Sequence, residues 1–261
     1  QLMDFAPGFG DPIIPKAVVF TAAIFFDSAT AGGKDWTNLG EGNTAFQNYI
    51  LDLTVDTGIG NPGAIGIDYL ANNLGAVRRV KIRSGDGQGV CGLAMFRKWP
   101  GPCLIKDVEI VGFDYGILAA HPQYSITFEH VALSGQRIAG IRNDGNVLGI
   151  RDLTSSNSVP AILNTGSQGL IVLLDSALNG GSSAVSAIEN DAGELFARNV
   201  VTTGYQSAVR DLGVVVPGAS IGELVTAPVQ SLFPSPNRSL GLPVEETPEL
   251  PHVSLADSVN V

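Results

Sequence analysis

Short segments in which apolar and polar residues alternate recur along the chain, and each ends close to a Gly or Ser. The repeats are "LDLTVDTG" (51–58), "RRVKIRSG" (78–85), "KDVEIVGF" (106–113), "EHVALSGQ" (129–136), "RDLTSSNS" (151–158), "LDSALNGG" (174–181) and "RNVVTTGY" (198–205). Their second residues lie 27, 28, 23, 22, 23 and 24 positions apart. Alternation of this length, followed by turn residues, predicts a half-buried β-strand at each repeat.

A second short apolar segment follows each repeat at a nearly fixed distance. These segments are "GAIGIDYL", "VCGLAMF", "YGILAAH", "AGIRNDG", "PAILNTG", "SAIENDA" and "SAVRDLG". A period in the twenties leaves no room for a long helix and is typical of a solenoid, and the phrase of a leucine-rich repeat is missing. The pattern therefore predicts an all-β, right-handed parallel β-helix with about seven or more rungs, a rung being one turn of the coil.

The predicted β-helix domain covers residues 1–212, with regular rungs from about residue 46. The rhythm fails from residue 213 onward, where the chain is rich in Pro. Such a composition is typical of an extended strap or an interdomain linker, which we expect over residues 213–261.

A polar phrase recurs inside the second set of segments: "GIRNDG" (140–145), "AILNTG" (161–166) and "AIENDAG" (187–193). If the Ile of each phrase points into the core, the side-chain period of two sends Asn143, Asn164 and Asn190 inward as well. Rungs stack about 4.8 Å apart, so these amides would hydrogen-bond to one another along a column. We expect a structural ladder of buried asparagines, because such bonding removes the cost of burying the amides.

Composition agrees with many short strands, since 44% of the 261 residues are hydrophobic, 15% are charged and 32 are Gly. The net charge of −10 argues against nucleic acid as a partner, because no basic surface would release counterions. The longest apolar run, "AVVFTAAIFF" (17–26), is too short to span a bilayer and predicts one or two buried strands. We therefore expect no membrane partner.

Cys91 and Cys103 match no metal motif by their spacing, and buried free thiols are favoured over a disulfide. Gln1 is not an initiator residue, which indicates that a leader or a longer N-terminal region has been removed. We accordingly expect an extracellular or periplasmic location.

The later rungs place charged side chains on one outer face. Asp144 and Asp191 occupy the same column two rungs apart, which predicts a backbone separation of roughly 9–10 Å, near the upper end of the window for inverting glycosidases. Glu189 would act as the acid if burial raises its pKa. These three carboxylates are the candidate catalytic residues, and the candidate sugar-binding residues are Trp99, His121, Tyr124, Arg142, Asp68 and Arg97.

Exposed acidic residues are most often solvated surface residues, so each of the three carboxylates could also be an ordinary surface residue without a catalytic role. His130 stands where other repeats have Asp, Arg or Asn, which favours a polar turn over a catalytic role. Arg142 near two carboxylates also leaves open a polysaccharide lyase assisted by calcium, although no metal site or other cofactor is predicted. No serine-hydrolase, phosphate-loop or zinc-protease motif occurs in the sequence.

Residues 46–117 resemble the pectate-lyase-like β-helix domains grouped with glycoside hydrolases, above all the exo-β-1,3-glucanase (laminarinase-type) branch and its bacterial relatives. The shared features are Val55-Asp56-Thr57 at a strand end, then Gly66-Ile67 and a long loop. The resemblance covers roughly residues 40–210 and implies a parallel β-helix that acts on polysaccharides. Such proteins usually have an Asp-rich first turn, which "DFAPGFGD" (4–11) matches only faintly, and commonly carry two β-helices side by side. A second β-helix domain or a second copy of the chain is therefore an expected partner.

Two classes of function follow from these patterns. The first is a secreted glycoside hydrolase that degrades a polysaccharide with Asp and Glu as acid and base. The second is a β-helix without catalytic activity that binds glycan or serves a structural role.

Overall fold

The computed structural model describes residues 9–21, 41–239 and 241–248. Within them the chain alternates between two β-sheets, and its other regular element is a short 3-10 helix, η2 (Gly42–Thr44). The 9-stranded sheet contains, in spatial order, β1 (Lys16–Phe20), β3 (Ala64–Asp68), β5 (Cys91–Met95), β7 (Tyr115–Ala120), β9 (Ala139–Asp144), β11 (Ile162–Asn164), β13 (Ile188–Asn190), β15 (Val209–Asp211) and β16 (Val214–Val216).

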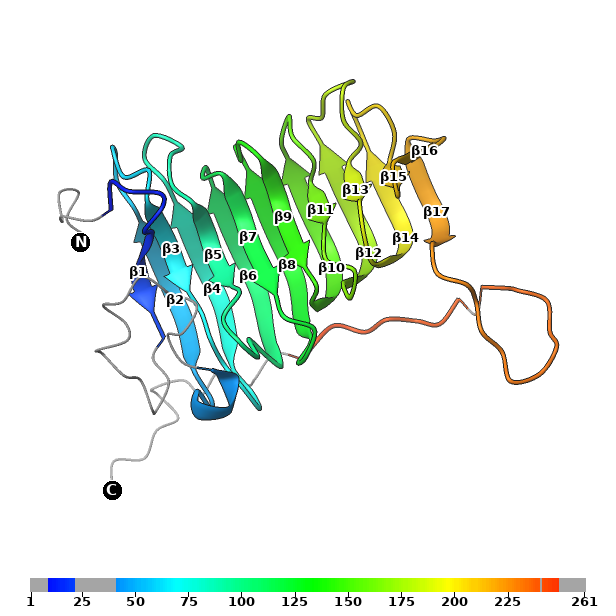
Figure 1. Ribbon diagram of the computed structural model, residues 1–261, viewed down its shortest axis with the longest axis horizontal. Coiled ribbons are helices and arrows are strands. Elements are labelled where there is room, and N and C mark those ends of the chain that lie inside the picture. The colour runs from blue at the N-terminus through cyan, green and yellow to red at the C-terminus, as the bar shows by residue number, and fades with distance from the viewer. Residues whose placement is uncertain (1–8, 22–40, 240, 249–261) are drawn as a thin grey trace, which may run out of the picture. The chain divides into compact units, whose positions relative to one another are not determined.

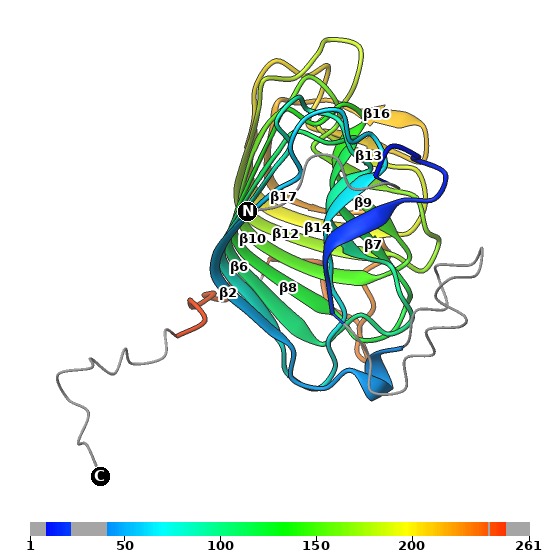
Figure 2. The ribbon, with the colours of Figure 1, turned by 90° about the vertical axis from the view of Figure 1, so that its left-hand side faces the viewer.

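The 8-stranded sheet lies opposite the first sheet (Figure 2). Its strands are, in chain order, β2 (Tyr49–Asp56), β4 (Ala76–Arg83), β6 (Cys103–Val111), β8 (Ile126–Ser134), β10 (Val147–Ser156), β12 (Leu170–Asn179), β14 (Glu194–Thr202) and β17 (Ser220–Val225). From β1 to β15, each strand pairs in parallel with the equivalent strand of the next rung, so the rungs follow one another in chain order (Figure 1). The predicted all-β parallel solenoid is confirmed, with about seven rungs.

Each strand of the 8-stranded sheet from β2 to β14 bends at one residue with a left-handed backbone conformation, φ between 49° and 57°. The bend residues are Asp52, Arg79, Asp107, His130, Asp152, Asp175 and Asn199. They are the second residues of the repeats found in the sequence, and most are Asp or Asn, which tolerate this conformation best. His130 is thus one of these bend residues.

A column of glycines explains why Gly precedes the inward apolar residue in the second set of segments. A Cβ on Gly66 would lie 2.3 Å from Cγ2 of Ile82, and a Cβ on Gly92 would lie 2.3 Å from Cγ2 of Ile110. Carbon atoms in contact need roughly 3.5–4.0 Å, so a side chain here would overlap the core. The column therefore lets the 9-stranded sheet approach the opposite sheet closely.

The asparagine ladder is confirmed. Asn143 Nδ2 donates to Asn164 Oδ1 (3.1 Å), and Asn164 Nδ2 donates to Asn190 Oδ1 (2.7 Å). Asn190 Nδ2 continues the series to Asp211 Oδ1 at 2.6 Å. All three asparagines are buried, so each amide bonds to its neighbour instead of water.

Two antiparallel strands cover the C-terminal end of the solenoid: β16 pairs with β15, and β17 pairs with β14. The compact unit accordingly runs to Pro228. The sequence rhythm fails at 213 because these cap strands reverse direction and no longer follow the rung repeat. The second unit, from Val229, has no strand or helix in its described residues.

Both cysteines are free and buried, as predicted, and burial raises the pKa of the Cys91 and Cys103 thiols. Strand β1 covers the first part of the apolar run 17–26, whereas residues 22–26 lie outside the described residues. No helix in the described part of the chain is both long and apolar enough to cross a membrane.

Candidate functional site

The predicted catalytic residues lie at or next to the C-terminal ends of two strands of the 9-stranded sheet, β9 and β13. We call Arg142, Asp144, Glu189, Asp191 and Arg210 the edge band. Register places Arg142, Leu163, Glu189 and Arg210 in one outward column, and Asp144 and Asp191 each follow a ladder asparagine by one residue. Asp144 and Asp191 are thus two rungs apart, which separates their backbone positions by about 9.6 Å in the direction in which the rungs stack.

Glu189 does not present a carboxylate to the outside. Its Oε1 accepts a hydrogen bond from the Ser186 N–H (2.9 Å), and its Oε2 accepts one from Arg210 Nε. Only 7% of its side chain is exposed. Because donors hold both oxygens, Glu189 cannot reach the leaving oxygen of a bound sugar in this arrangement, and its evident effect is to orient Arg210.

The other two carboxylates differ in their partners. Asp191 Oδ1 accepts from Arg210 Nη2 at 3.1 Å, so Arg210 bridges Asp191 and Glu189. The hydrogen bond that Arg210 donates to Glu189 is the largest cause of the raised pKa of Arg210. Asp144 is 56% exposed, and its closest charged neighbour is Arg142 Nη2 at 4.0 Å. Asp144 is therefore the carboxylate of the edge band that is most available to a ligand.

Loops that follow β5 and β7 bring together Lys98, Trp99, His121 and Tyr124, which we call the loop cluster. The Trp99 and Tyr124 rings meet edge to face, with centroids 6.1 Å apart. Lys98 Nζ lies 3.8 Å from the centroid of the Trp99 ring and also pairs with Glu41 at 2.7 Å. One face of Trp99 is therefore taken by a cation, and the exposed Tyr124 ring is the better surface for a sugar.

Burial and the nearby Lys98 charge lower the pKa of His121. Buried Asn146 fixes the start of the loop that begins at His121. Its Nδ2 donates to the carbonyl oxygens of Ala120 (3.3 Å) and His121 (2.5 Å). Ala120 is the register partner of Asp144, so His121 starts one strand, about 4.8 Å, away from the edge band. The loop cluster therefore begins one rung away from Asp144 of the edge band.

Asp68 and Arg97, predicted to bind sugar, are buried. Arg97 Nε donates to Asp68 Oδ1 at 2.8 Å, and the guanidinium lies 4.3 Å from the centroid of the Phe20 ring. Burial raises the pKa of Asp68 and lowers that of Arg97, while their attraction opposes both shifts. These two side chains, with Phe20, link the first three rungs.

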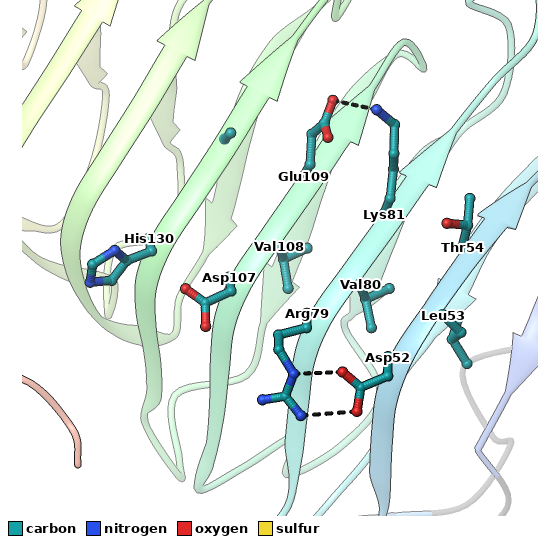
Figure 3. Close-up of a pocket in the computed structure, with 11 residues that line it drawn as sticks. Asp52, Leu53, Thr54, Arg79, Val80, Lys81, Asp107, Val108, Glu109 and His130 are labelled. Atoms are coloured by element: carbon teal, nitrogen blue, oxygen red, sulfur yellow. Dashed lines mark hydrogen bonds and ion pairs between the residues drawn. The ribbon is translucent and has the colours of Figure 1, made fainter. Parts of the chain in front are cut away.

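A shallow groove of about 460 Å³ lies on the outside of the 8-stranded sheet (Figure 3). The bend residues of the first four rungs line one side, and Thr54, Lys81, Glu109 and Ala132 line the other. Leu53, Val80 and Val108 lie between these two rows (Figure 3). Its charged side chains pair across rungs, Asp52 with Arg79 (2.5 Å) and Lys81 with Glu109 (2.7 Å). This groove was not predicted, although the charges that alternate at the second residues of the first three repeats, Asp52, Arg79 and Asp107, are visible in the sequence.

Among the described residues, no three His, Cys, Asp or Glu side chains are grouped so that they could hold a metal ion. No protein-family model matches the chain, and comparison with curated proteins finds no match.

Proposed function

We propose that this protein is a secreted carbohydrate-binding β-solenoid whose edge band and loop cluster hold a neutral polysaccharide. The observation that carries the proposal is the exposed Asp144 carboxylate one rung from the start of the His121–Tyr124 loop, on a strand that the asparagine ladder links to the next. The resemblance of residues 46–117 to pectate-lyase-like domains of glycoside hydrolases supports the same class of ligand.

The chemistry of the surface suits a sugar chain. Sugars offer hydroxyl groups to polar side chains and apolar ring faces to aromatic ones. Asp144 would accept hydrogen bonds from hydroxyls, Arg142 would donate to ring or hydroxyl oxygens, and Tyr124 would stack on a ring face. The net charge of −10 favours a neutral polysaccharide over a polyuronate, because the protein's field repels anions.

Hydrolysis is the second candidate, and the separation of Asp144 and Asp191 favours it. About 9.6 Å is near the upper limit for an inverting pair, which needs room for a water molecule. An acid and a base in unlike environments would be needed, and both carboxylates are instead largely exposed, with Asp191 bound to Arg210. Binding without turnover is for this reason the leading proposal.

Affinity electrophoresis and calorimetry with a panel of neutral and acidic polysaccharides test the proposal. We expect a neutral glycan to bind, and Asp144→Asn and Tyr124→Ala each to weaken its affinity about tenfold, or about 1.4 kcal/mol. Thr154→Ala, an exposed change on β10, is the matched control and should leave binding unchanged. Absence of binding to every glycan contradicts the proposal, whereas release of reducing sugar that Asp144→Asn abolishes supports the hydrolase.

A further inference from the structure

The two ends of the solenoid differ in how well they cover the core. One inward column of the 8-stranded sheet runs through all rungs: Leu53, Val80, Val108, Val131, Leu153, Ser176 and Val200. At the C-terminal end, Val200 is 1% exposed because Ile221 of β17 lies against it. At the N-terminal end, Leu53 is 38% exposed although it belongs to the same column. Among the described residues, this column is therefore less well covered at the first rung than at the last.

Strand β2, which carries Leu53, is the edge strand of its sheet. Tyr49 is 55% exposed and Leu51 is 43% exposed on the same strand, and the neighbouring Phe46 is exposed as well. β2 contains neither Lys nor Pro, the residues that most often protect an edge from pairing. Within the described residues β2 is the last strand of its sheet, and its eight residues include exposed apolar side chains, which is the kind of edge to which another strand adds.

The acidic side chains of β2 do not oppose such pairing. Asp52 accepts hydrogen bonds from Arg79 Nε (2.5 Å) and Nη2 (2.9 Å), and Asp56 forms an ion pair with Arg83 Nη2 (2.7 Å). Both carboxylates are thus compensated within their own chain. A second β2 edge would meet an apolar surface without a net excess of like charge.

We infer that β2 is a dimerisation edge, on which β2 of a second copy pairs in antiparallel orientation about a two-fold axis. An isologous contact needs a surface that is complementary to itself, and an apolar strand with compensated acids satisfies this condition. The chain itself shows that a bent strand accepts an antiparallel neighbour. β14 bends at Asn199, and β17 pairs with it on both sides of that bend: Phe196 is the register partner of Val225, and Val201 is the register partner of Ser220.

The experiment is a measurement of molar mass by light scattering during size exclusion, on the full chain over a range of concentrations. We expect a species of twice the 27.1 kDa chain mass. Leu51→Lys, which places two ammonium groups in the interface, should raise the dissociation constant about a hundredfold. Val214→Lys is the matched control, because Val214 is an exposed aliphatic residue on the cap strand at the opposite end, and it should leave the mass unchanged.

Each result decides the inference. A single-chain mass at all concentrations overturns it, and so does an open-ended series of masses, which would indicate head-to-tail stacking. A dimer that Val214→Lys dissociates and Leu51→Lys does not would place the interface at the C-terminal end and likewise overturn it. Circular dichroism of both variants establishes that any change in mass occurs in folded protein, as the exposure of both positions leads us to expect.

Discussion

Individual polar residues inside this protein fix the register of its rungs. A one-residue slip of β9 against β11 or of β11 against β13 would turn the ladder amides outward and leave their partners unpaired in the core. Hydrophobic side chains alone would tolerate such a slip better, because apolar contacts have no direction. The ladder therefore contributes specificity as well as stability.

Asn164→Ala removes the central amide of the ladder. Asn190 Oδ1 then loses its donor, while Asn143 Nδ2 keeps a second acceptor, the Asn146 carbonyl at 2.8 Å. We expect the free energy of unfolding, from urea denaturation, to fall by about 1–3 kcal/mol. Thr154→Ala is exposed and should stay within about 0.5 kcal/mol of the parent. Equal midpoints for the parent and Asn164→Ala would show that the ladder amides add nothing.

The pH response of His121 follows from burial and from Lys98, which lower its pKa from the ordinary 6.5. As the pH falls below 6.5, the unfolded chain takes up this proton before the folded one, so the fold loses stability until the folded imidazole is protonated as well. Lys98→Gln should raise the pKa of His121 part of the way back, measured by NMR titration of the ring protons. Lys81→Gln, on the other sheet, should not. A pKa that Lys98→Gln leaves unchanged would contradict the electrostatic contribution.

Strands could be predicted from this sequence because alternation is a local property that survives in each repeat. The bends at Asp52 and its equivalents were not predicted, since a single left-handed residue interrupts alternation without a turn sequence around it. The side-chain period of two correctly placed Asp68 on the outward side of its strand. The period does not show whether another segment of the same chain covers that side. Arg97 reaches Asp68 from the next rung, a contact that depends on the path of a loop.

In the candidate site, the positions of the residues could be predicted and their hydrogen-bond partners could not. Register in the structure confirms that Arg142 and Glu189 share one outward column, as the period of two predicted. The partners of Glu189 were not predictable, because the Ser186 N–H belongs to a loop and Arg210 belongs to the following rung. Spacing along a repeat fixes positions on a face, whereas hydrogen bonds depend on distances that the repeat does not encode.

Gly92→Ala tests the close approach of the two sheets at the level of one strand. The added Cβ would lie 2.3 Å from Ile110 Cγ2 and 3.0 Å from the Gly116 carbonyl oxygen, so β5 or the core must move. We expect a loss of about 1–3 kcal/mol in unfolding free energy. Gly149→Ala on β10 is the control, because nothing lies within 4 Å of its Cβ position, and it should be neutral or stabilising by about 0.4–1 kcal/mol. Equal losses in both variants would contradict the packing argument.

At the scale of the molecule, a solenoid is close to one-dimensional: each strand pairs only with its neighbours in the two adjacent rungs. Stability is then nearly a sum of rung and interface contributions, and the ends decide where opening begins. The C-terminal end has a cap that the N-terminal end lacks in the described residues, since Ile221 covers Val200 while Leu53 stays exposed.

Ile221→Asp places a carboxylate where β17 meets the last rung. Ile221 is buried, so the charge should detach β17 from β14 and expose Val200. Hydrogen exchange measured by mass spectrometry should then accelerate in β17 and β14, while β4 and β6 keep their protection because β14, β12, β10 and β8 lie between them and β17. Ser220→Ala, an exposed change on the same strand, should leave all rates unchanged. Uniform acceleration across all rungs would instead mean that the solenoid opens as one cooperative unit, and the cap would then stabilise every rung equally.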